Sequence, residues 1–288
     1  MLSKNILITG ANSYIGTNFA SWLSAWAQEY TVETVSTLNG EWKTKSFAGY
    51  DVVLHVAGIA HASLDPKLEE LYMEVNRDLA IAAAQKAKAD GVRQFIFMSS
   101  ILIYGKDGQV GDDLIITAET APNPADFYGR SKLEADLAIQ AEANGSFKAA
   151  VIRTPVVYGP GCKGNFPKLV KMAKICPIFP DISNQRSMIY IDNLCEFLKQ
   201  VIDQGKNGIF FPQNRDYVCT SEVVRTAAKT MGKKVKMTAF FNPILRFLSR
   251  KIAFINKVFG NKAYDKNLSG DYSYCVVDFE ESVRRCVL

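Results

Sequence analysis

The sequence predicts an α/β protein with a doubly wound parallel sheet and a smaller C-terminal lobe, and two observations predict it. Short apolar runs alternate with helical patterns through the first half of the chain, which is typical of βαβ units. After Pro155 this alternation weakens, and turn-rich segments follow at residues 158–161 and 176–180. In a doubly wound sheet the ligand crevice lies at the carboxyl ends of the strands, so functional residues are expected there.

Each expected strand is a short, largely apolar run, and the clearest of them lack the polar alternation of a strand that faces water. The first expected helix has apolar residues at three- and four-residue spacing. The second is long and Ala-rich and stops at Asp90-Gly91, a C-terminal helix signal. The expected strands span residues 6–9, 31–36, 51–56, 94–98 and 149–153, and the expected helices span residues 15–27, 68–89 and 128–143.

Composition excludes several protein classes. With 48% hydrophobic and 22% charged residues, the chain is not disordered, collagen-like or a disulfide-stapled scaffold. Its six Cys are scattered without a C-x-x-C pair, so we expect no metal site and a reducing, cytoplasmic location. The formal net charge of +5 suits a small phosphorylated ligand better than nucleic acid. The first apolar run is too short for a signal peptide or a membrane span.

The first functional motif is the turn between the first strand and the first helix. A tight turn at a helix N-terminus lets backbone N–H groups and the helix dipole bind a pyrophosphate. Gly10 would permit the turn and Gly16 the close packing of helix on strand, while Ser13 replaces the middle glycine of the usual pattern. An ordinary strand–turn–helix corner is the alternative interpretation. The expected dinucleotide-binding residues in this turn are Gly10, Asn12, Ser13, Tyr14, Ile15 and Gly16.

Ser36 occupies the end of the second strand, where an acidic residue would bind the ribose 2′-hydroxyl of NAD. No acid lies there, and no Arg that would accept the 2′-phosphate of NADP follows directly. The choice between NAD and NADP therefore stays open.

The second functional motif pairs Tyr128 with Lys132, which lie four residues apart and so on one face of a helix. A lysine ammonium close to a phenol stabilises the phenolate, so we expect the pKa of Tyr128 to lie below its usual value near 10. Tyr128 would then act as an acid and base on a hydroxyl group. Ser99 and Ser100 end the preceding strand and place a hydroxyl at the crevice edge. A solvated pair on a surface helix is the alternative interpretation.

These motifs resemble the extended branch of the short-chain dehydrogenase/reductase superfamily, the nucleotide-sugar epimerases and dehydratases, whose fold is a Rossmann domain with a C-terminal substrate lobe. The resemblance runs through nearly the whole chain. Besides the two motifs above, it rests on His55-Val56-Ala57-Gly58, on Asn76, on residues 99–105, on residues 153–160 and on residues 186–192.

The resemblance implies roles for individual residues. Ser100, Tyr128 and Lys132 match the family's catalytic residues, and Lys132 would also bind the nicotinamide ribose. Arg186 matches an arginine that pairs with the nucleotide diphosphate, a role that its forked guanidinium suits. The further cofactor-binding residues implied are Ser36, Ala57, Gly58, Asn76, Ser99, Tyr128, Lys132 and Pro155, and the substrate-binding residues are Ser100, Asn165 and Arg186.

Two departures from the family pattern narrow the reaction. The 4,6-dehydratases of this branch carry an Asp-Glu pair directly after the catalytic residue, and here Ile101 and Leu102 stand there, so dehydration is disfavoured. Val156 stands where many members have an Asn that contacts the sugar nucleotide, and Asn165 is the expected replacement. The motifs at residues 153–160 and 186–192 look like those of a subgroup that acts in bacterial capsule and O-antigen synthesis. Its members are UDP-N-acetylhexosamine 4-epimerases or 4-ketoreductases.

The expected function is NAD(P)-dependent oxidoreduction at C4 of a UDP-sugar, foremost 4-epimerisation in the synthesis of surface polysaccharide precursors. A UDP-4-keto-sugar 4-reductase that uses NADPH is the first alternative, and a catalytically silent dinucleotide-sensing protein is the second. The resemblance also implies a homodimer built on the helix at 68–89 and the active-site helix.

The expected domains are a dinucleotide-binding domain at residues 1–157, with a return segment at about 188–212, and a substrate-binding lobe at 158–187 and 213–288. Within the lobe, residues 242–260 form one expected amphipathic helix with Ile244, Leu248, Ile252, Ile255 and Phe259 on one face and basic residues opposite. We expect this helix to be a lid that packs its apolar face on the lobe, and contact with a membrane is the less favoured alternative.

Overall fold

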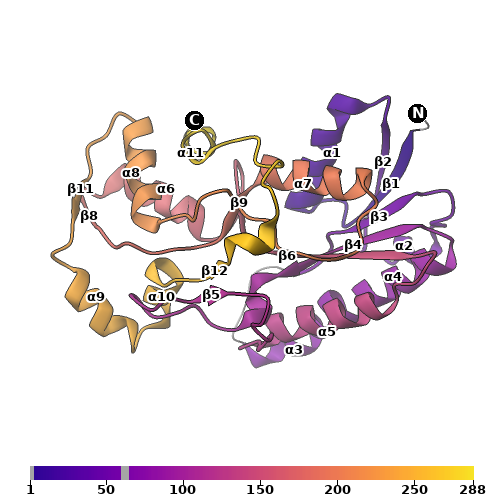
Figure 1. Cartoon of the computed structure of the whole chain (residues 1–288), viewed down its shortest axis with the longest axis horizontal. Helices are drawn as coiled ribbons and strands as arrows, with labels where there is room; N and C mark the ends of the chain where they lie inside the picture. Colours follow the sequence, from indigo (N-terminus) through magenta and orange to yellow (C-terminus); the bar gives the residue numbers. More distant parts are fainter. Residues whose placement is uncertain (1–2, 60–64) are drawn as a thin grey trace. The chain divides into compact units, whose positions relative to one another are not determined.

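A computed structural model of the chain describes residues 3–59 and 65–288 (Figure 1). The chain forms two compact units, each built from three segments. The first unit comprises Met1–Gly105, Ala121–Thr154 and Leu194–Pro212, and the second comprises Lys106–Thr120, Pro155–Asn193 and Gln213–Leu288. Residues 106–120 thus belong with the second unit, although the sequence placed them in the dinucleotide-binding domain.

The first unit is built around a six-stranded parallel sheet, which confirms the predicted fold class. The strand order is β10-β6-β4-β3-β1-β2, so the chain leaves β1 toward β2 and then returns to build the other side from β3 onward. The switch point therefore lies between β1 and β3, where this type of sheet binds ligands. The strands are β1 (Lys4–Thr9), β2 (Tyr30–Val35), β3 (Val52–His55), β4 (Gln94–Ser100), β6 (Lys148–Thr154) and β10 (Gly208–Phe210).

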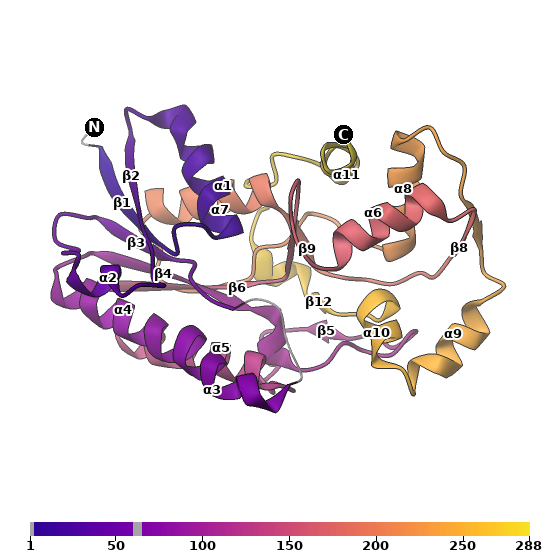
Figure 2. The same cartoon turned by 180° about the vertical axis from the view of Figure 1, so that it is seen from behind.

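Helices cover both faces of this sheet, with α4 and α5 side by side on one face and α1 and α7 on the other (Figures 1 and 2). Four fully buried alanines of α4, at positions 80, 83, 84 and 87, let this helix approach the sheet closely, where it packs on Leu7, Val53 and Phe95. The helices of this unit are α1 (Tyr14–Leu23), α2 (Glu41–Thr44), α3 (Glu69–Tyr72), α4 (Leu79–Ala89), α5 (Phe127–Ala141) and α7 (Ile191–Asp203, which begins in the second unit). Short 3-10 turns span Ser24–Trp26, Pro66–Leu68 and Ile101–Tyr104.

The long helix expected at residues 68–89 is interrupted. A π-helical segment, Met73–Asp78, separates α3 from α4 and holds the buried Asn76. Such wide turns inside helices often mark functional sites, because they re-aim a side chain without ending the helix.

The second unit combines helices with three pairs of short parallel strands. Its core includes Tyr158, which stacks on Phe166 at a centroid distance of 4.4 Å and shares a 2.7 Å hydrogen bond with Ser282. The strand pairs are β7 (Val156–Tyr158) with β9 (Met188–Tyr190), β8 (Ile178–Pro180) with β11 (Lys236–Thr238), and β5 (Ile115–Ile116) with β12 (Ala263–Tyr264). The remaining elements are α6 (Asn165–Ile175), α8 (Thr220–Thr230), α9 (Asn242–Ser249), α10 (Ala253–Phe259), the 3-10 turn Lys266–Ser269 and α11 (Phe279–Val287).

The prediction of one amphipathic helix over residues 242–260 is wrong. The chain leaves the helical conformation at Ile252, whose φ of −117° and ψ of 97° are extended, and this break separates α9 from α10. The expected apolar face packs on the lobe only in part. Phe259 is buried and its ring lies 5.8 Å from that of Phe179, whereas Ile244 is 55% exposed and Ile252 is 44% exposed. Among the helices of the described residues, none combines the length and the apolar character needed to span a membrane.

Candidate active site

The turn after β1 is shaped by a close backbone approach that only glycine allows. Gly10 has a φ of +106°, and a Cβ atom there would lie 2.8 Å from the backbone nitrogen of Ala57, directly after β3. Its N–H donates a 2.9 Å hydrogen bond to the carbonyl oxygen of Val35 at the end of β2. Gly10 therefore joins the carboxyl ends of three neighbouring strands at the switch point of the sheet.

The N-terminus of α1 follows immediately. Ser13 caps it, because its Oγ accepts a 3.1 Å hydrogen bond from the backbone N–H of Gly16. A Cβ atom on Gly16 would lie 3.0 Å from a methyl group of Val56 and 3.1 Å from one of Ile8, so the glycine lets α1 sit close to β1 and β3. Asn12, Tyr14 and Ile15 lie in the same turn and first helical residues. Glycines at both close approaches, together with the positive end of the helix dipole of α1, fit a dinucleotide pyrophosphate.

Ser36 lies directly after β2, on the other side of the same turn. Its Oγ accepts a 3.3 Å hydrogen bond from the backbone N–H of Leu38. The structure therefore places Ser36 beside the strand end that carries Gly10, as the sequence predicts, and its role toward a ribose stays a prediction.

Gly58, Asn76 and Lys132 form a cluster at the end of β3. A Cβ atom on Gly58 would lie 2.9 Å from the Oδ1 of Asn76 and 3.3 Å from the Nζ of Lys132. The Asn76 amide holds the backbone of Ile59 from both sides, since its Oδ1 accepts a 2.8 Å bond from the N–H and its Nδ2 donates a 3.2 Å bond to the carbonyl oxygen. The π-helical segment thus fixes the chain that leaves β3.

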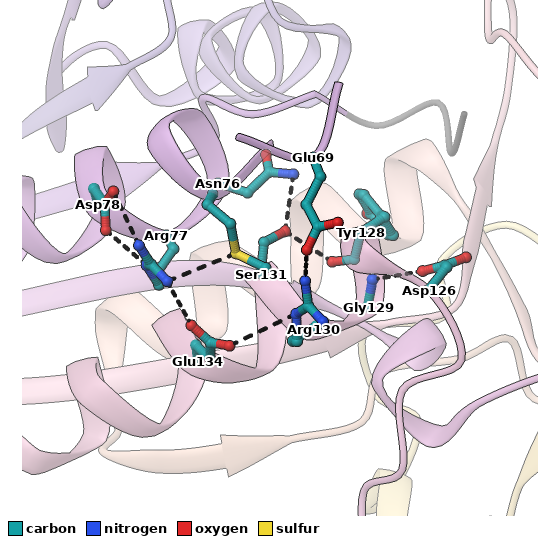
Figure 3. Close-up of polar contacts among 11 residues, drawn as sticks. Glu69, Asn76, Arg77, Asp78, Asp126, Tyr128, Gly129, Arg130, Ser131 and Glu134 are labelled. Carbon is teal, nitrogen blue, oxygen red and sulfur yellow. Dashed lines mark hydrogen bonds and ion pairs between the residues drawn. The ribbon is translucent and has the colours of Figure 1, made fainter. Parts of the chain in front are cut away.

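Tyr128 and Lys132 lie on α5, which begins at Phe127 because Asp126 caps it with a 2.8 Å hydrogen bond from the N–H of Gly129 (Figure 3). Both side chains are buried, Tyr128 to 7% and Lys132 to 6% exposure. The Nζ of Lys132 donates a 2.9 Å hydrogen bond to the carbonyl oxygen of Met98 on β4. Burial lowers the pKa of Lys132 to about 8, and the charge of Asp136 opposes this shift.

Ser100 ends β4 and lies next to Tyr128. It is 8% exposed, its Oγ accepts a 3.2 Å hydrogen bond from the N–H of Leu102, and it hydrogen-bonds the Tyr128 hydroxyl. The structure therefore brings the three expected catalytic residues, Ser100, Tyr128 and Lys132, to one edge of the sheet.

The expected lowering of the Tyr128 pKa is not found. Burial raises the pKa of this phenol, and the hydrogen bond from Ser100 only partly opposes the rise. The ammonium of Lys132 is directed to Met98 instead of the phenol. Within the chain itself, Ser100 and not Lys132 is the group that favours the phenolate.

The hydroxyl of Ser99 is bound within the chain, and the role of this residue toward a cofactor stays a prediction. Its Oγ donates a 2.8 Å hydrogen bond to the Oδ2 of Asp136, a fully buried carboxylate one helical turn beyond Lys132. Asp136 also accepts two hydrogen bonds, of 2.9 and 3.0 Å, from the guanidinium of Arg153 on β6. Arg153 in turn donates a 2.6 Å hydrogen bond to the hydroxyl of Tyr104. The sequence reasoning missed this network, although its i, i+4 spacing from Lys132 placed Asp136 on the inner face of α5.

In the second unit, Asn165 and Arg186 line one open pocket. It holds about 650 Å³ of empty space, counting solvent at its mouth. Three of its lining residues are cationic, and none is acidic. The guanidinium of Arg186 is held in place by a 3.0 Å ion pair with Asp107 and a 2.8 Å hydrogen bond to the carbonyl oxygen of Gly260. The walls are β7 and β9 residues Val156 and Met188, α6 residues Asn165, Phe166, Lys168, Leu169 and Met172, Arg186, Val218, α8 residues Thr220 and Val223, and α10 residues Phe254, Lys257 and Val258.

The remaining expectations concern Pro155 and metals. Pro155 follows the end of β6 and belongs to the second unit. His55 is a buried core residue that shares a 2.7 Å hydrogen bond with Thr9 and stacks on Phe95. Among residues 3–59 and 65–288, no cluster of three or more His, Cys, Asp or Glu side chains could hold a metal ion.

The chain resembles known proteins along most of its length. The family model described as the NAD dependent epimerase/dehydratase family matches residues 6–219. A UDP-glucose 4-epimerase of Vibrio cholerae is 33% identical over 256 residues, which cover 81% of this chain and 77% of the relative. An N-acetyl-α-D-glucosaminyl-diphospho-ditrans,octacis-undecaprenol 4-epimerase of Escherichia coli O157:H7 is 22% identical and covers 81% of this chain and 74% of its own.

Solved structures show the same fold. The dTDP-glucose 4,6-dehydratase DesIV of Streptomyces venezuelae, solved with NAD, superimposes with a TM-score of 0.73 at 18% identity and covers 98% of this chain and 95% of its own. Other structures of this fold hold NAD in one case and NADP in another. The match over residues 6–219, together with the glycine turn and the Ser-Tyr-Lys cluster, shows that the chain belongs to the NAD-dependent epimerase/dehydratase family, an enzyme family of the extended short-chain dehydrogenase/reductases.

Proposed function

We propose that the protein catalyses NAD(P)-dependent oxidoreduction at C4 of a UDP-sugar, and specifically 4-epimerisation in the synthesis of surface polysaccharide precursors. The observation that carries this proposal is the cluster of Ser100, Tyr128 and Lys132 at the carboxyl end of β4. All three side chains are buried, and Lys132 also lies close to the end of β3, since a Cβ atom on Gly58 would be 3.3 Å from its Nζ. The 33% identical 4-epimerase from Vibrio cholerae supports the reaction class.

The Tyr128 hydroxyl is the group that takes and returns the proton of the sugar hydroxyl. Its environment suits both directions, since burial favours the protonated phenol while the hydrogen bond from Ser100 favours the phenolate. A nicotinamide cofactor held there would supply the hydride chemistry, accepting a hydride from the sugar carbon and returning it. Gly58, Asn76 and Lys132 would line the nicotinamide ribose, and the turn from Gly10 to Gly16 would hold the pyrophosphate.

Dehydration is disfavoured by the residues that follow Ser100. Ile101 and Leu102 form the 3-10 turn after β4, and Ile101 is 5% exposed. Hydrocarbon side chains there can neither donate nor accept the proton that elimination of water requires.

The pocket in the second unit supports binding of an anionic substrate. The cations of Lys168, Arg186 and Lys257 would attract a diphosphate, and the fixed fork of the Arg186 guanidinium suits bidentate contact with phosphate oxygens. Asn165 adds a neutral hydrogen-bonding group to the same pocket.

We further propose a cytoplasmic homodimer formed through the helical segment at residues 68–89, which holds α3 and α4, and through α5. Leu71 on α3 is 43% exposed and Leu137 on α5 is 55% exposed. Around them, Glu69 of α3 pairs with Arg130 of α5, and Arg77 of the π-helical segment pairs with Glu134 of α5 (Figure 3). Measuring the mass of the protein in solution tests the dimer, and a monomer would contradict it.

The reaction is tested by incubating the protein with UDP-N-acetylglucosamine or UDP-glucose and following sugar identity and nicotinamide absorbance together. Epimerisation gives the C4 isomer without a net absorbance change. Stoichiometric oxidation of added NADPH by a UDP-4-keto sugar would replace the proposal with the reductase. Bound nicotinamide with no turnover of any UDP-sugar would replace it with the dinucleotide-sensing protein.

A further inference from the structure

Charge is distributed very unevenly along this chain. Between Val223 and Tyr264 there are ten Lys and Arg residues and no Asp or Glu. The whole chain has a formal net charge of +5, so the remainder of the sequence carries −5. A cationic segment on an otherwise acidic protein indicates a surface that meets an anionic partner.

The same segment exposes unusually large apolar side chains. Every exposed phenylalanine in residues 3–59 and 65–288 lies there. We name the set the α9–α10 surface, and it consists of Phe240 (76% exposed), Phe241 (39%), Ile244 (55%), Phe247 (60%), Ile252 (44%) and Phe254 (55%). These six residues fall within fifteen positions of the chain, and the rings of Phe240 and Phe241 contact each other at a centroid distance of 5.4 Å. Exposed apolar residues that gather in this way, unlike single ones, mark an interaction site.

Cations accompany these apolar side chains on the same two helices and the link between them. Arg246, Arg250, Lys251 and Lys257 are all exposed. The segment itself contains no Asp or Glu, and α9 lies at the periphery of the second unit in both views (Figures 1 and 2). Arg246 lies beside an acidic loop, since a Cβ atom on Gly111 would be 3.7 Å from its Nε and Asp112 follows that glycine. Short helices with aromatic and aliphatic residues beside lysines and arginines are typical of elements that lie in the interface of an anionic bilayer.

We propose that the α9–α10 surface docks the protein on an anionic lipid bilayer, with its phenylalanines in the acyl boundary and its cations at the headgroups. The charge favours this partner over a second copy of the chain, because two such surfaces would bring like charges together. Ile244 and Ile252 favour it over nucleic acid, because a phosphate backbone offers no hydrocarbon for them to enter.

Docking would involve the pocket of the second unit. Phe254 belongs to the α9–α10 surface and also lines that pocket, as does Lys257. One wall of the pocket, α10, would therefore be part of the docked surface. The docking itself does not depend on the proposed reaction, so the two proposals can fail separately.

Sedimentation of the full chain with vesicles tests the proposal. Vesicles of equal parts phosphatidylcholine and phosphatidylglycerol are expected to carry the protein down, and vesicles of phosphatidylcholine alone are expected to bind it far more weakly. Added salt is expected to release the protein, because it screens the attraction between the exposed cations and the lipid phosphates.

Two sets of variants separate the apolar contribution to vesicle binding from the electrostatic one. Phe240→Ser with Phe247→Ser is expected to weaken binding to the anionic vesicles about tenfold or more. The reason is the loss of two aromatic rings that would be buried in the acyl boundary of the docked protein. Arg246→Gln with Arg250→Gln and Lys251→Gln is expected to weaken it by a similar factor and to flatten its salt dependence. These side chains are exposed, so thermal unfolding of both variants should match that of the unaltered protein.

Matched controls use equally exposed residues elsewhere. Leu38→Ser removes a side chain that is 88% exposed in the first unit, and Lys163→Gln with Lys171→Gln and Lys174→Gln removes three exposed cations near or on α6. Neither control should change vesicle binding. The proposal is overturned if the unaltered protein stays in solution with anionic vesicles, or if the controls weaken binding as much as the variants. It is also overturned if the α9–α10 variants leave vesicle binding unchanged and alter only the mass of the protein in solution, because the surface would then join two copies of the chain.

Discussion

The Nζ of Lys132 lies 2.9 Å from the carbonyl oxygen of Met98 and donates a hydrogen bond to it, which ties the active-site helix to the strand that ends in Ser100. The same ammonium lies 4.8 Å from the centroid of the Phe97 ring. Burial lowers the pKa of this lysine to about 8, so its charge is retained at a cost to stability. Removal of the charge should therefore stabilise the folded protein.

Lys132→Met should raise the stability of the protein at pH 7. The folded-state pKa lies below the unfolded one, so below about pH 8 both states are protonated and the full cost of the buried charge is present. The cost disappears as pH rises through the window from about 8 to 10.5, because only the unfolded state is still protonated there. We expect a gain of roughly 2–3 kcal/mol in the free energy of unfolding at pH 7.

Urea unfolding at pH 7 and at pH 9 measures this gain. The difference between variant and unaltered protein should be smaller at pH 9. A variant that is less stable than the unaltered protein at pH 7 would show that the hydrogen bond to Met98 outweighs the burial of the charge.

Asp136→Asn should destabilise the first unit strongly. The carboxylate is fully buried, binds the guanidinium of Arg153 and accepts a hydrogen bond from the hydroxyl of Ser99. Its neutral replacement leaves the buried charge of Arg153 without a counter-ion, which costs about 3–5 kcal/mol. Urea unfolding gives the value. Asp78→Asn is the matched control, because the Asp78 side chain is 54% exposed and its partner Arg77 keeps an ion pair with Glu134 (Figure 3). The expected loss there is below about 1 kcal/mol. Equal losses in both variants would refute the role assigned to Asp136.

Arg186→Gln should raise the KM for the UDP-sugar about tenfold to a hundredfold and lower kcat much less. The guanidinium lines the pocket of the second unit and is held by Asp107, so its removal weakens binding of the diphosphate in ground state and transition state alike. Steady-state kinetics give both constants, and the affinity for NAD should not change. Arg246→Gln, an exposed cation outside the pocket, is the control. A fall in kcat at constant KM would place Arg186 in the chemistry instead.

The parts of the fold that follow from short-range patterns could be predicted from the sequence. Gly10 and Gly16 frame the turn because their spacing is set by the geometry of one strand and one helix, and both lie at the close approaches expected of them. The parallel sheet follows from uninterrupted apolar runs, which only a strand buried on both faces requires.

The features that the sequence did not predict depend on contacts between distant residues. The π-helical segment is fixed by Asn76, which holds Ile59 seventeen residues earlier, and no local pattern announces that contact. The break at Ile252 leaves the three- and four-residue spacing of apolar side chains intact, so periodicity alone extends one helix across it. The hydrogen bond from Ser99 to Asp136 was not predicted either, because it joins residues 37 positions apart on a strand and a helix.

The most direct test of the proposed chemistry is the turnover of Tyr128→Phe with the UDP-sugar that the unaltered protein epimerises. Phenylalanine keeps the ring that packs edge-on against Tyr72 at 6.2 Å and removes only the hydroxyl. We predict a fall in kcat of about a hundredfold or more with nicotinamide binding retained, because the proton acceptor is lost. A variant that turns over within a few-fold of the unaltered rate would contradict the assignment of Tyr128.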